Sequence, residues 1–471
     1  MQSTLPAPPK QSRGNAHQLF PSTLFADKTI RPPTFYNVLH AEFVCTELLP
    51  KLPHIFWVIW TAHLIDSDAP TVVCQPGKHL GVLILQILMK ETDRGIEFRV
   101  KQTPVHQLFC GFGVVKKWKC PDHTKIEEFR NRLNPETHKF LGDFVLKTAH
   151  KLGFSDPSWM DVDSTVQEAN MAYPSDASLL KKLSLKVNKV IEYLKSKRKK
   201  YLPEDLKIDI KTICKKAQAY FFLSKKTDIE KKRTAFKDYF YFVKQELSQA
   251  IKFIEGLSPQ ASVHLPGNIA RASGFIRNQG RRYLLDVAHF TREHSIKKGK
   301  RLCFHLSMVV CISKGKLDKK HEFGRQFQLG RIGGNFLIPL ATEVKMEDKK
   351  SLVPMVENHI QIFGQKVLEE IGTDKGYYAH KNVKAISAMG INTNGIQRPA
   401  NAKRKPPKDI TDPLRDRRAG IEPLIGHLKS FGLRKSKMKS DETTHSSVYR
   451  CTMGFNLHQI VRHMTGAMKT T

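Results

Sequence analysis

The stretch most suited to chemistry is 418–429, in which one carboxylate lies between two cations. Glu422 follows Arg418 by four positions and precedes Lys429 by seven, so a helix would place all three on one face over about three turns. The carboxylate could ligate a metal ion while the cations hold a phosphate backbone. The same spacing is also typical of an amphipathic helix with i,i+4 ion pairs, and the spacing alone does not separate the two interpretations.

The same stretch predicts the helix that would carry these residues. Apolar residues recur at helical spacing and would form a stripe against a core: Ile421, Leu424, Ile425 and Leu428. Pro423 restricts the start of the helix, because a proline inside a helix removes a hydrogen bond and clashes with the preceding turn. Either the helix kinks there, or it begins near Glu422 and Arg418 lies on the turn before it.

The composition predicts a polyanionic partner. The 471 residues include 78 Lys and Arg and 44 Asp and Glu, a net charge of +34, which favours nucleic acid first and an anionic membrane surface second. No apolar run reaches the roughly 18 residues of a membrane span. None of the eight cysteines forms a Cys-x-x-Cys pair, so we expect neither structural zinc nor a disulfide framework. No signal peptide is expected, and the location is predicted to be cytoplasmic.

The chain divides into four predicted parts. Residues 1–35 are rich in Pro, Ser and Gln and predict a poorly ordered lead-in, and 36–153 predict a helical domain that could bind DNA. Residues 154–176 and 300–471 alternate strands and helices. Between them, 177–299 predict a basic helical insertion in which lysine clusters alternate with aromatic residues. Those aromatic residues suit either helix packing or contacts to a DNA strand.

The alternating part has a definite order once the insertion is removed. It predicts a strand at 159–165 with Asp161 and Asp163 on one face, a hairpin, a helix, a strand that stops at Asp374, and a final helix with Glu422. The remaining ranges are 304–312 and 327–341 for the hairpin, 353–364 for the helix, 393–413 for a loop and 448–464 for one more helix. This order predicts an α/β, RNase H-like core, a mixed sheet flanked by helices in which three carboxylates converge.

Several blocks of the chain together resemble the DDE transposases of bacterial insertion sequences, in the branch with an Arg-x3-Glu-x6-Lys signature. The resemblance covers roughly 75–465. It rests on four blocks in order, which are 163–170 with 173–176, 311–316 with 322–325, 372–377 and 418–429. The helical segment 121–133 also resembles the domain that these enzymes carry before the catalytic one.

The resemblance implies metal-dependent cleavage at the ends of a mobile element and strand transfer. Asp163, Asp374 and Glu422 would be the catalytic ligands of two divalent ions, Mg²⁺ or Mn²⁺, with Asp163 bridging both. Asp161 is the rival for the first ligand, and the family's Asp-Ser-Thr block favours Asp163. The implied partners are the terminal inverted repeats and target DNA, with a dimer on DNA, no membrane and a place at the bacterial nucleoid.

Cations near these carboxylates are expected to contact DNA. They are Arg418, Lys429, Arg415, Lys314, Lys316 and Lys375. Arg415 stands where the family often has a tyrosine, which would exchange stacking on a base for charge. Two alternatives stay open: an RNase H-like nuclease without strand transfer, and a non-catalytic DNA-binding relic of a transposable element.

Overall fold

The computed structural model describes residues 76–110, 112, 120–197, 202–203, 206–223, 227–258, 265–295, 297, 299–313, 321–342, 347–391, 393–398, 408–438 and 440–464. The predicted lead-in 1–35 and the two lysines Lys314 and Lys316 lie outside these ranges. The chain forms two compact units, Met1–Arg132 and Leu133–Thr471. Within the described part, no helix is both long and apolar enough to cross a membrane.

The first unit consists of helices where it is described: α3 (Pro76–Met89), α4 (Asp93–Gln102), α5 (Pro104–Phe109) and α6 (His123–Arg132). Asp122 caps α6, because its carboxylate accepts a hydrogen bond from the Lys125 amide at 2.9 Å. Arg130 of α6 forms a bidentate ion pair with Asp93 of α4. Since this arginine is largely buried, it holds two helices together and is a poor candidate for a DNA contact.

The second unit is an α/β structure whose described part contains a mixed six-stranded sheet. Its strands are β1 (Trp159–Glu168), β2 (Val310–Ser313), β3 (His321–Ile332), β4 (Phe336–Leu340), β5 (Glu370–Thr373) and β6 (Thr393–Ile396). The order is β2-β3-β1-β5-β6. β4 also pairs with β3, at its later residues, whereas β2 pairs with the first residues of β3. β1 is antiparallel to β3 and parallel to β5, which is parallel to β6. The predicted strand 159–165 is confirmed as β1, which continues to Glu168, and the predicted strand that stops at Asp374 is confirmed as β5.

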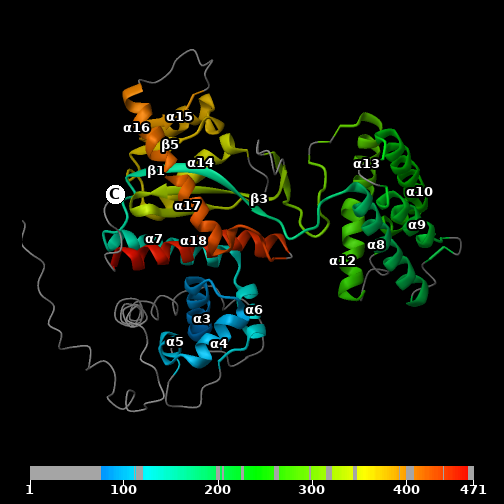
Figure 1. Ribbon diagram of the computed structural model, residues 1–471, viewed down its shortest axis with the longest axis horizontal. Coiled ribbons are helices and arrows are strands. Elements are labelled where there is room, and N and C mark those ends of the chain that lie inside the picture. The colour runs from blue at the N-terminus through cyan, green and yellow to red at the C-terminus, as the bar shows by residue number, and fades with distance from the viewer. Residues whose placement is uncertain are drawn as a thin grey trace, which may run out of the picture. The chain divides into compact units, whose positions relative to one another are not determined.

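Helices lie on both faces of the sheet (Figure 1). They are α7 (Pro135–Lys151), α14 (Asp348–Phe363), α15 (His380–Ala388), α16 (Lys408–Ala419), α17 (Ile421–Leu428) and α18 (Asp441–Met464). Leu329 and Leu337 pack with Leu424 and Leu428 of α17 and with α18 in one buried cluster. α7, which the sequence grouped with the preceding helices, packs along α18 and belongs to the second compact unit.

A hairpin turn divides the stretch 327–341, which the sequence predicted as one run. β3 ends at Ile332, the 3-10 turn η5 (Gly333–Asn335) follows, and β4 begins at Phe336. Gly334 has φ of 74°, and a Cβ there would lie 2.0 Å from the Phe154 carbonyl oxygen, so the turn requires glycine. The first predicted strand, 304–312, is shorter than expected, because β2 covers only Val310–Ser313.

The predicted loop 393–413 was wrong at both ends. β6 occupies its start and α16 its end. The Asn, Pro and Lys residues favour a loop locally, but tertiary packing overrides that preference. Gly395 of β6 lies so close to Leu414 of α16 that a Cβ would be 2.7 Å from the leucine Cδ1. A residue without a side chain thus allows α16 to cover the end of the sheet.

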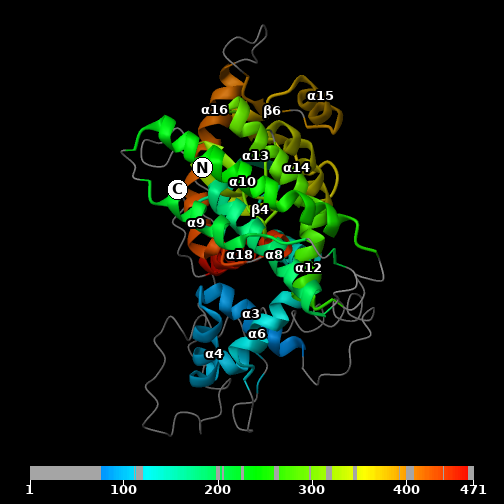
Figure 2. The same ribbon diagram turned by 90° about the vertical axis from the view of Figure 1, so that its right-hand side faces the viewer.

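The range between β1 and β2 forms a helical bundle with its own core (Figures 1 and 2). Its described elements are α8 (Asp176–Lys197), α9 (Ile210–Phe221), α10 (Ile229–Glu255), α12 (Gly267–Phe275), the π-helical η4 (Ile276–Gly280) and α13 (Arg281–Glu293). Tyr239 and Phe240 are buried in this core, whereas Phe222 and Tyr241 are exposed. The packing interpretation is therefore confirmed for the buried aromatic residues, and the contact to a DNA strand stays a prediction for the exposed ones.

Candidate functional site

Asp163, in the middle of β1, and Asp374, directly after the end of β5, lie at neighbouring positions of two paired strands. β1 and β5 run parallel, and their last aligned residues are Val162 and Thr373, so the two aspartates follow at neighbouring positions. Burial raises the pKa of the Asp163 carboxyl above its usual range, and the charge of Asp374 raises it further. Two carboxylates in such proximity repel each other, and a cation between them would relieve this repulsion.

Arg418 supplies positive charge to this pair. Its Nη2 donates to Asp163 Oδ2 at 2.9 Å, and both side chains are mostly buried, with 15% and 17% exposed. The Ser164 amide donates to the other carboxylate oxygen at 2.7 Å. These two donors lower the pKa of Asp163 and so oppose the effects of burial and of Asp374. Arg418 thus contacts a predicted metal ligand directly.

Asp161 lies on the same strand face as Asp163, but its ion pairs serve to hold a helix on the sheet. It is fully buried and pairs with Arg417 at 3.2 Å and with Arg331 at 3.8 Å. The Arg417 guanidinium also contacts Glu370 and stacks 4.4 Å from the Trp159 ring centroid. This network holds α16 on the sheet, and the next residue of α16, Arg418, then lies over Asp163.

Two glycines make this close approach of α16 possible. A Cβ at Gly372 would lie 2.5 Å from Asp161 Oδ1 and 3.4 Å from the Leu414 carbonyl oxygen. A Cβ at Gly420, between α16 and α17, would lie 2.2 Å from the Arg331 guanidinium. A side chain at Gly372 would displace the Asp161 carboxylate and one at Gly420 the Arg331 guanidinium, so either would disturb the ion pairs that hold α16.

Asp374 is held by the turn that follows it. Its Oδ1 accepts a hydrogen bond from the Gly376 amide at 2.8 Å and caps the 3-10 turn η6 (Lys375–Tyr377). Asp374 therefore fills the role of a turn-capping aspartate, which the sequence also allowed, while it lies beside Asp163. The cap leaves its second carboxylate oxygen available for another ligand.

A hydrogen-bonded chain that the sequence did not predict supports this turn. The Tyr377 hydroxyl donates to Gln328 Oε1 at 2.5 Å, and Gln328 donates to Asp348 Oδ1 at 3.0 Å. Gln326 donates to the same oxygen at 2.8 Å. Burial raises the pKa of Tyr377 well above its usual value, and nearby Asp348, Asp163 and Asp374 add to the rise. The sequence predicted that this helix begins at 353, but α14 begins at Asp348. The prediction therefore left Asp348 outside the helix and missed its role.

Glu422 does not join the two aspartates. It lies in the first turn of α17, and its side chain is exposed. Among the residues that the structure describes, no three His, Cys, Asp or Glu side chains are grouped so that they could hold a metal ion. The prediction that Arg418, Glu422 and Lys429 share one helix face was wrong for Arg418, which ends α16, because Gly420 separates that helix from α17.

The other predicted DNA contacts have varied surroundings. Arg415 is exposed and pairs with its neighbours Asp412 and Asp416 at 3.1 Å each. Lys375 is exposed in η6, beside Asp374. Lys429 is half-buried at the start of the π-helical turn η7 (Lys429–Leu433). Of these three, Lys375 has the placement best suited to a substrate near the two aspartates.

The site thus consists of two adjacent aspartates, an arginine on one of them and a braced turn under the other. The chemistry of this set is oxygen ligation of a hard divalent cation, since carboxylates are the ligands that Mg²⁺ and Mn²⁺ prefer. In comparisons with known proteins, no protein-family model, curated protein or solved structure matches the chain.

Proposed function

We propose that the chain is a DDE transposase of an insertion sequence, which cleaves phosphodiester bonds at the element ends and transfers the strands into target DNA. The observation that carries the proposal is the adjacency of Asp163, within β1, and Asp374, which follows the parallel strand β5, with Arg418 bound to Asp163. The net charge of +34 supports a nucleic-acid partner, because phosphates are the most abundant multivalent anions that such a surface attracts.

The sheet supports an RNase H-like core for this enzyme. β1 is central, antiparallel strands lie on one side of it and parallel strands on the other. After β6, the helices α16 and α17 pack against β1. Asp163 of the central strand and Asp374 after β5 are neighbours in this arrangement, which supports the proposal.

The donor set fits a divalent cation such as Mg²⁺ or Mn²⁺. Asp163 and Asp374 would hold it, since both are carboxylates and their mutual repulsion favours a shared cation. When bound, the cation would supply activation of an attacking oxygen and stabilisation of the leaving oxygen. Glu422 is the remaining carboxylate of the proposed set, and its exposed position in the first turn of α17 leaves its oxygens accessible.

The residues of the chain would bind and orient the DNA. Arg418 carries its positive charge beside Asp163, where it would attract the phosphate that is to be cut. Lys375 is exposed next to Asp374 and would contact the same strand. The Asp161 and Arg417 pair fixes α16, so Arg418 keeps its place while the substrate changes.

A cleavage assay on the DNA that flanks the coding region tests the proposal. The purified chain with Mg²⁺ or Mn²⁺ should cut at inverted repeats in those flanks and join the ends to a second DNA molecule. Asp163→Asn, Asp374→Asn and Glu422→Gln should abolish cleavage and retain DNA binding. Cleavage in EDTA would refute metal catalysis, and cleavage without joined products would favour a nuclease.

In the described part of the chain no third carboxylate joins Asp163 and Asp374, and this favours a second candidate, a DNA-binding protein derived from such an enzyme that no longer cleaves. In this case the wild-type chain would bind the flanking DNA without cutting it under any metal condition. The three carboxylate variants would then bind with the affinity of the wild type, and none would differ from it in any product.

A further inference from the structure

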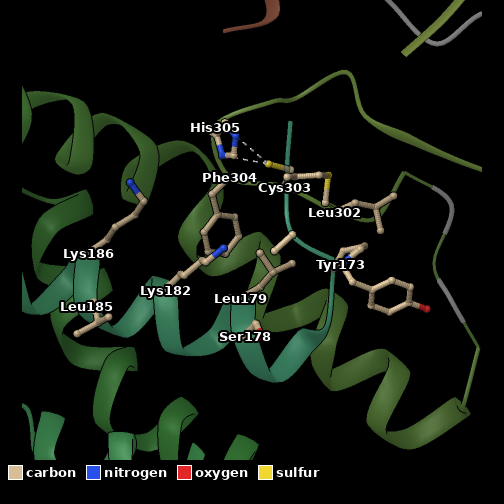
Figure 3. A pocket seen from close by; sticks show the side chains of 13 residues that line it. Tyr173, Ser178, Leu179, Lys182, Leu185, Lys186, Leu302, Cys303, Phe304 and His305 are labelled. Atoms are coloured by element: carbon tan, nitrogen blue, oxygen red, sulfur yellow. Dashed lines mark hydrogen bonds between the residues drawn. The ribbon is translucent and has the colours of Figure 1, made fainter. Parts of the chain in front are cut away.

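A cavity of about 350 Å³ lies in the helical bundle, away from the residues assigned above. Segment 171–174, the start of α8 and segment 302–305 line it, and Figure 3 shows its side chains. The volume falls within the range of small-molecule sites, which is roughly 300–1,000 Å³. None of its lining residues is Asp or Glu.

The wall of this cavity is apolar and rigid. Leu179 and Phe304 are both buried, and both belong to the bundle core. The Phe304 ring packs 4.8 Å from Phe275 and 5.1 Å from Tyr283, measured between ring centroids. A ring held on two sides in this way offers a fixed surface for a flat ligand.

The rim of the cavity is cationic. Lys182 and Lys186 are one helical turn apart on α8, and in Figure 3 both side chains extend on the side of Phe304 and His305. Lys186 also lies 5.6 Å from the Phe275 ring centroid. Burial and the nearby charge of Lys189 lower the pKa of Lys186. A bound anion would oppose both effects.

The remaining polar groups at the rim are already arranged. His305 Nε2 lies 3.2 Å from the Asn170 carbonyl oxygen, which can only accept, so this nitrogen carries the proton. Nδ1, 3.1 Å from Cys303 Sγ, then accepts from the thiol. Tyr173 is 74% exposed and presents an aromatic ring beside the opening.

We propose that this cavity binds one unpaired nucleotide of a DNA strand, with its base against Leu179 and Phe304 and its phosphates at Lys182 and Lys186. An apolar wall with an exposed aromatic ring suits a base of any sequence, and paired lysines suit the adjoining phosphates. This inference rests on the proposed function, since it takes DNA as the ligand and assigns part of the insertion to single-strand binding.

Binding of fluorescent oligothymidylate in EDTA tests the inference, because no cleavage is needed. Lys182→Ala/Lys186→Ala should weaken binding by about tenfold and lower the salt slope by about two units. The control is Lys181→Ala/Lys195→Ala, which removes the same charge from parts of α8 that do not line the cavity, and it should change affinity less than about twofold. Equal losses in both double variants would overturn the inference.

Two further arms address the base. An abasic oligonucleotide of equal length should bind the wild type more weakly than oligothymidylate does. Lys182→Ala/Lys186→Ala should weaken the binding of the abasic strand further, because the two lysines contact phosphates. Ala172→Phe, which adds bulk to the cavity without changing charge, should weaken oligothymidylate binding while thermal unfolding stays unchanged. Equal affinity for normal and abasic strands would overturn the inference. A wild type that binds no DNA would instead refute the proposed function.

Discussion

The Nη2 atom of Arg418 lies 2.9 Å from Oδ2 of Asp163, so the last turn of α16 binds the carboxylate in the middle of β1. The adjacent residue, Arg417, binds Asp161 two positions earlier on β1. Two consecutive arginines at the end of one helix therefore bind two carboxylates on the same face of one strand. Asp161 is fully buried, and its pair with Arg417 fixes the helix, whereas the pair of Arg418 and Asp163 lies at the proposed site.

Replacing Arg418 should change the pH range in which the site takes a cation. Arg418 opposes the burial and the Asp374 charge that raise the pKa of Asp163, so Arg418→Ala should raise that pKa further. The Mg²⁺-induced rise in melting temperature should then disappear at a correspondingly higher pH. Arg418→Lys should return this pH most of the way to the wild-type value. Arg415 is exposed, so Arg415→Ala should behave as wild type. An unchanged midpoint in Arg418→Ala would contradict the assignment.

Replacing Arg417 should destabilise the fold. Asp161 is fully buried, and removal of its partner leaves a carboxylate without its closest countercharge. We expect Arg417→Ala to lower the free energy of unfolding by about 3–5 kcal/mol in urea titrations. Asp161→Asn/Arg417→Ala should recover part of this loss, since no buried charge is then left uncompensated. A loss below about 1 kcal/mol would show that the network is not what holds α16.

Removing the Tyr377 hydroxyl should loosen the turn that carries Asp374. Tyr377→Phe keeps the ring but leaves Gln328 Oε1, which is buried, without its donor, at a cost of about 1–3 kcal/mol. Hydrogen exchange of the η6 amides should become faster, and the affinity for Mg²⁺ should fall. The matched control is Tyr378→Phe, whose ring stacks with Arg398 and should not need its hydroxyl. Exchange rates that stay the same in both variants would refute the bracing role.

His359 should make the fold sensitive to acid. Burial lowers the pKa of this histidine from 6.5 to about 4, so the unfolded chain binds the proton more readily than the folded chain. The contribution of neutral, buried His359 to the free energy of unfolding is therefore fully present above pH 6.5 and is lost as the pH falls toward 4. We expect a loss of about 2 kcal/mol at pH 5 relative to pH 8. His359→Leu should flatten this dependence in urea titrations, whereas the exposed His380→Asn should not. An unchanged pH dependence of the free energy of unfolding in His359→Leu would contradict the role assigned to this histidine.

Local sequence patterns determined the elements that have a strong period or a clear end. The alternation at 159–165 predicted β1, and the apolar spacing from Ile421 to Leu428 predicted α17. Pro423 restricted the start of α17, and the helix does begin at Ile421. The order of strands predicted that three carboxylates would converge, and two of them, Asp163 and Asp374, are neighbours because they follow the aligned residues Val162 and Thr373 of parallel strands.

The tertiary structure alone decided which charges meet and which face water. Asp161 and Asp163 look alike in the sequence, but only Asp161 is fully buried, because α16 packs over it through Gly372 and Arg417. Glu422 has the spacing of a third ligand yet is exposed. The chain Asp348, Gln328 and Tyr377 joins three separate elements. Such contacts depend on how helices pack across a sheet, and residues distant in the sequence determine that packing.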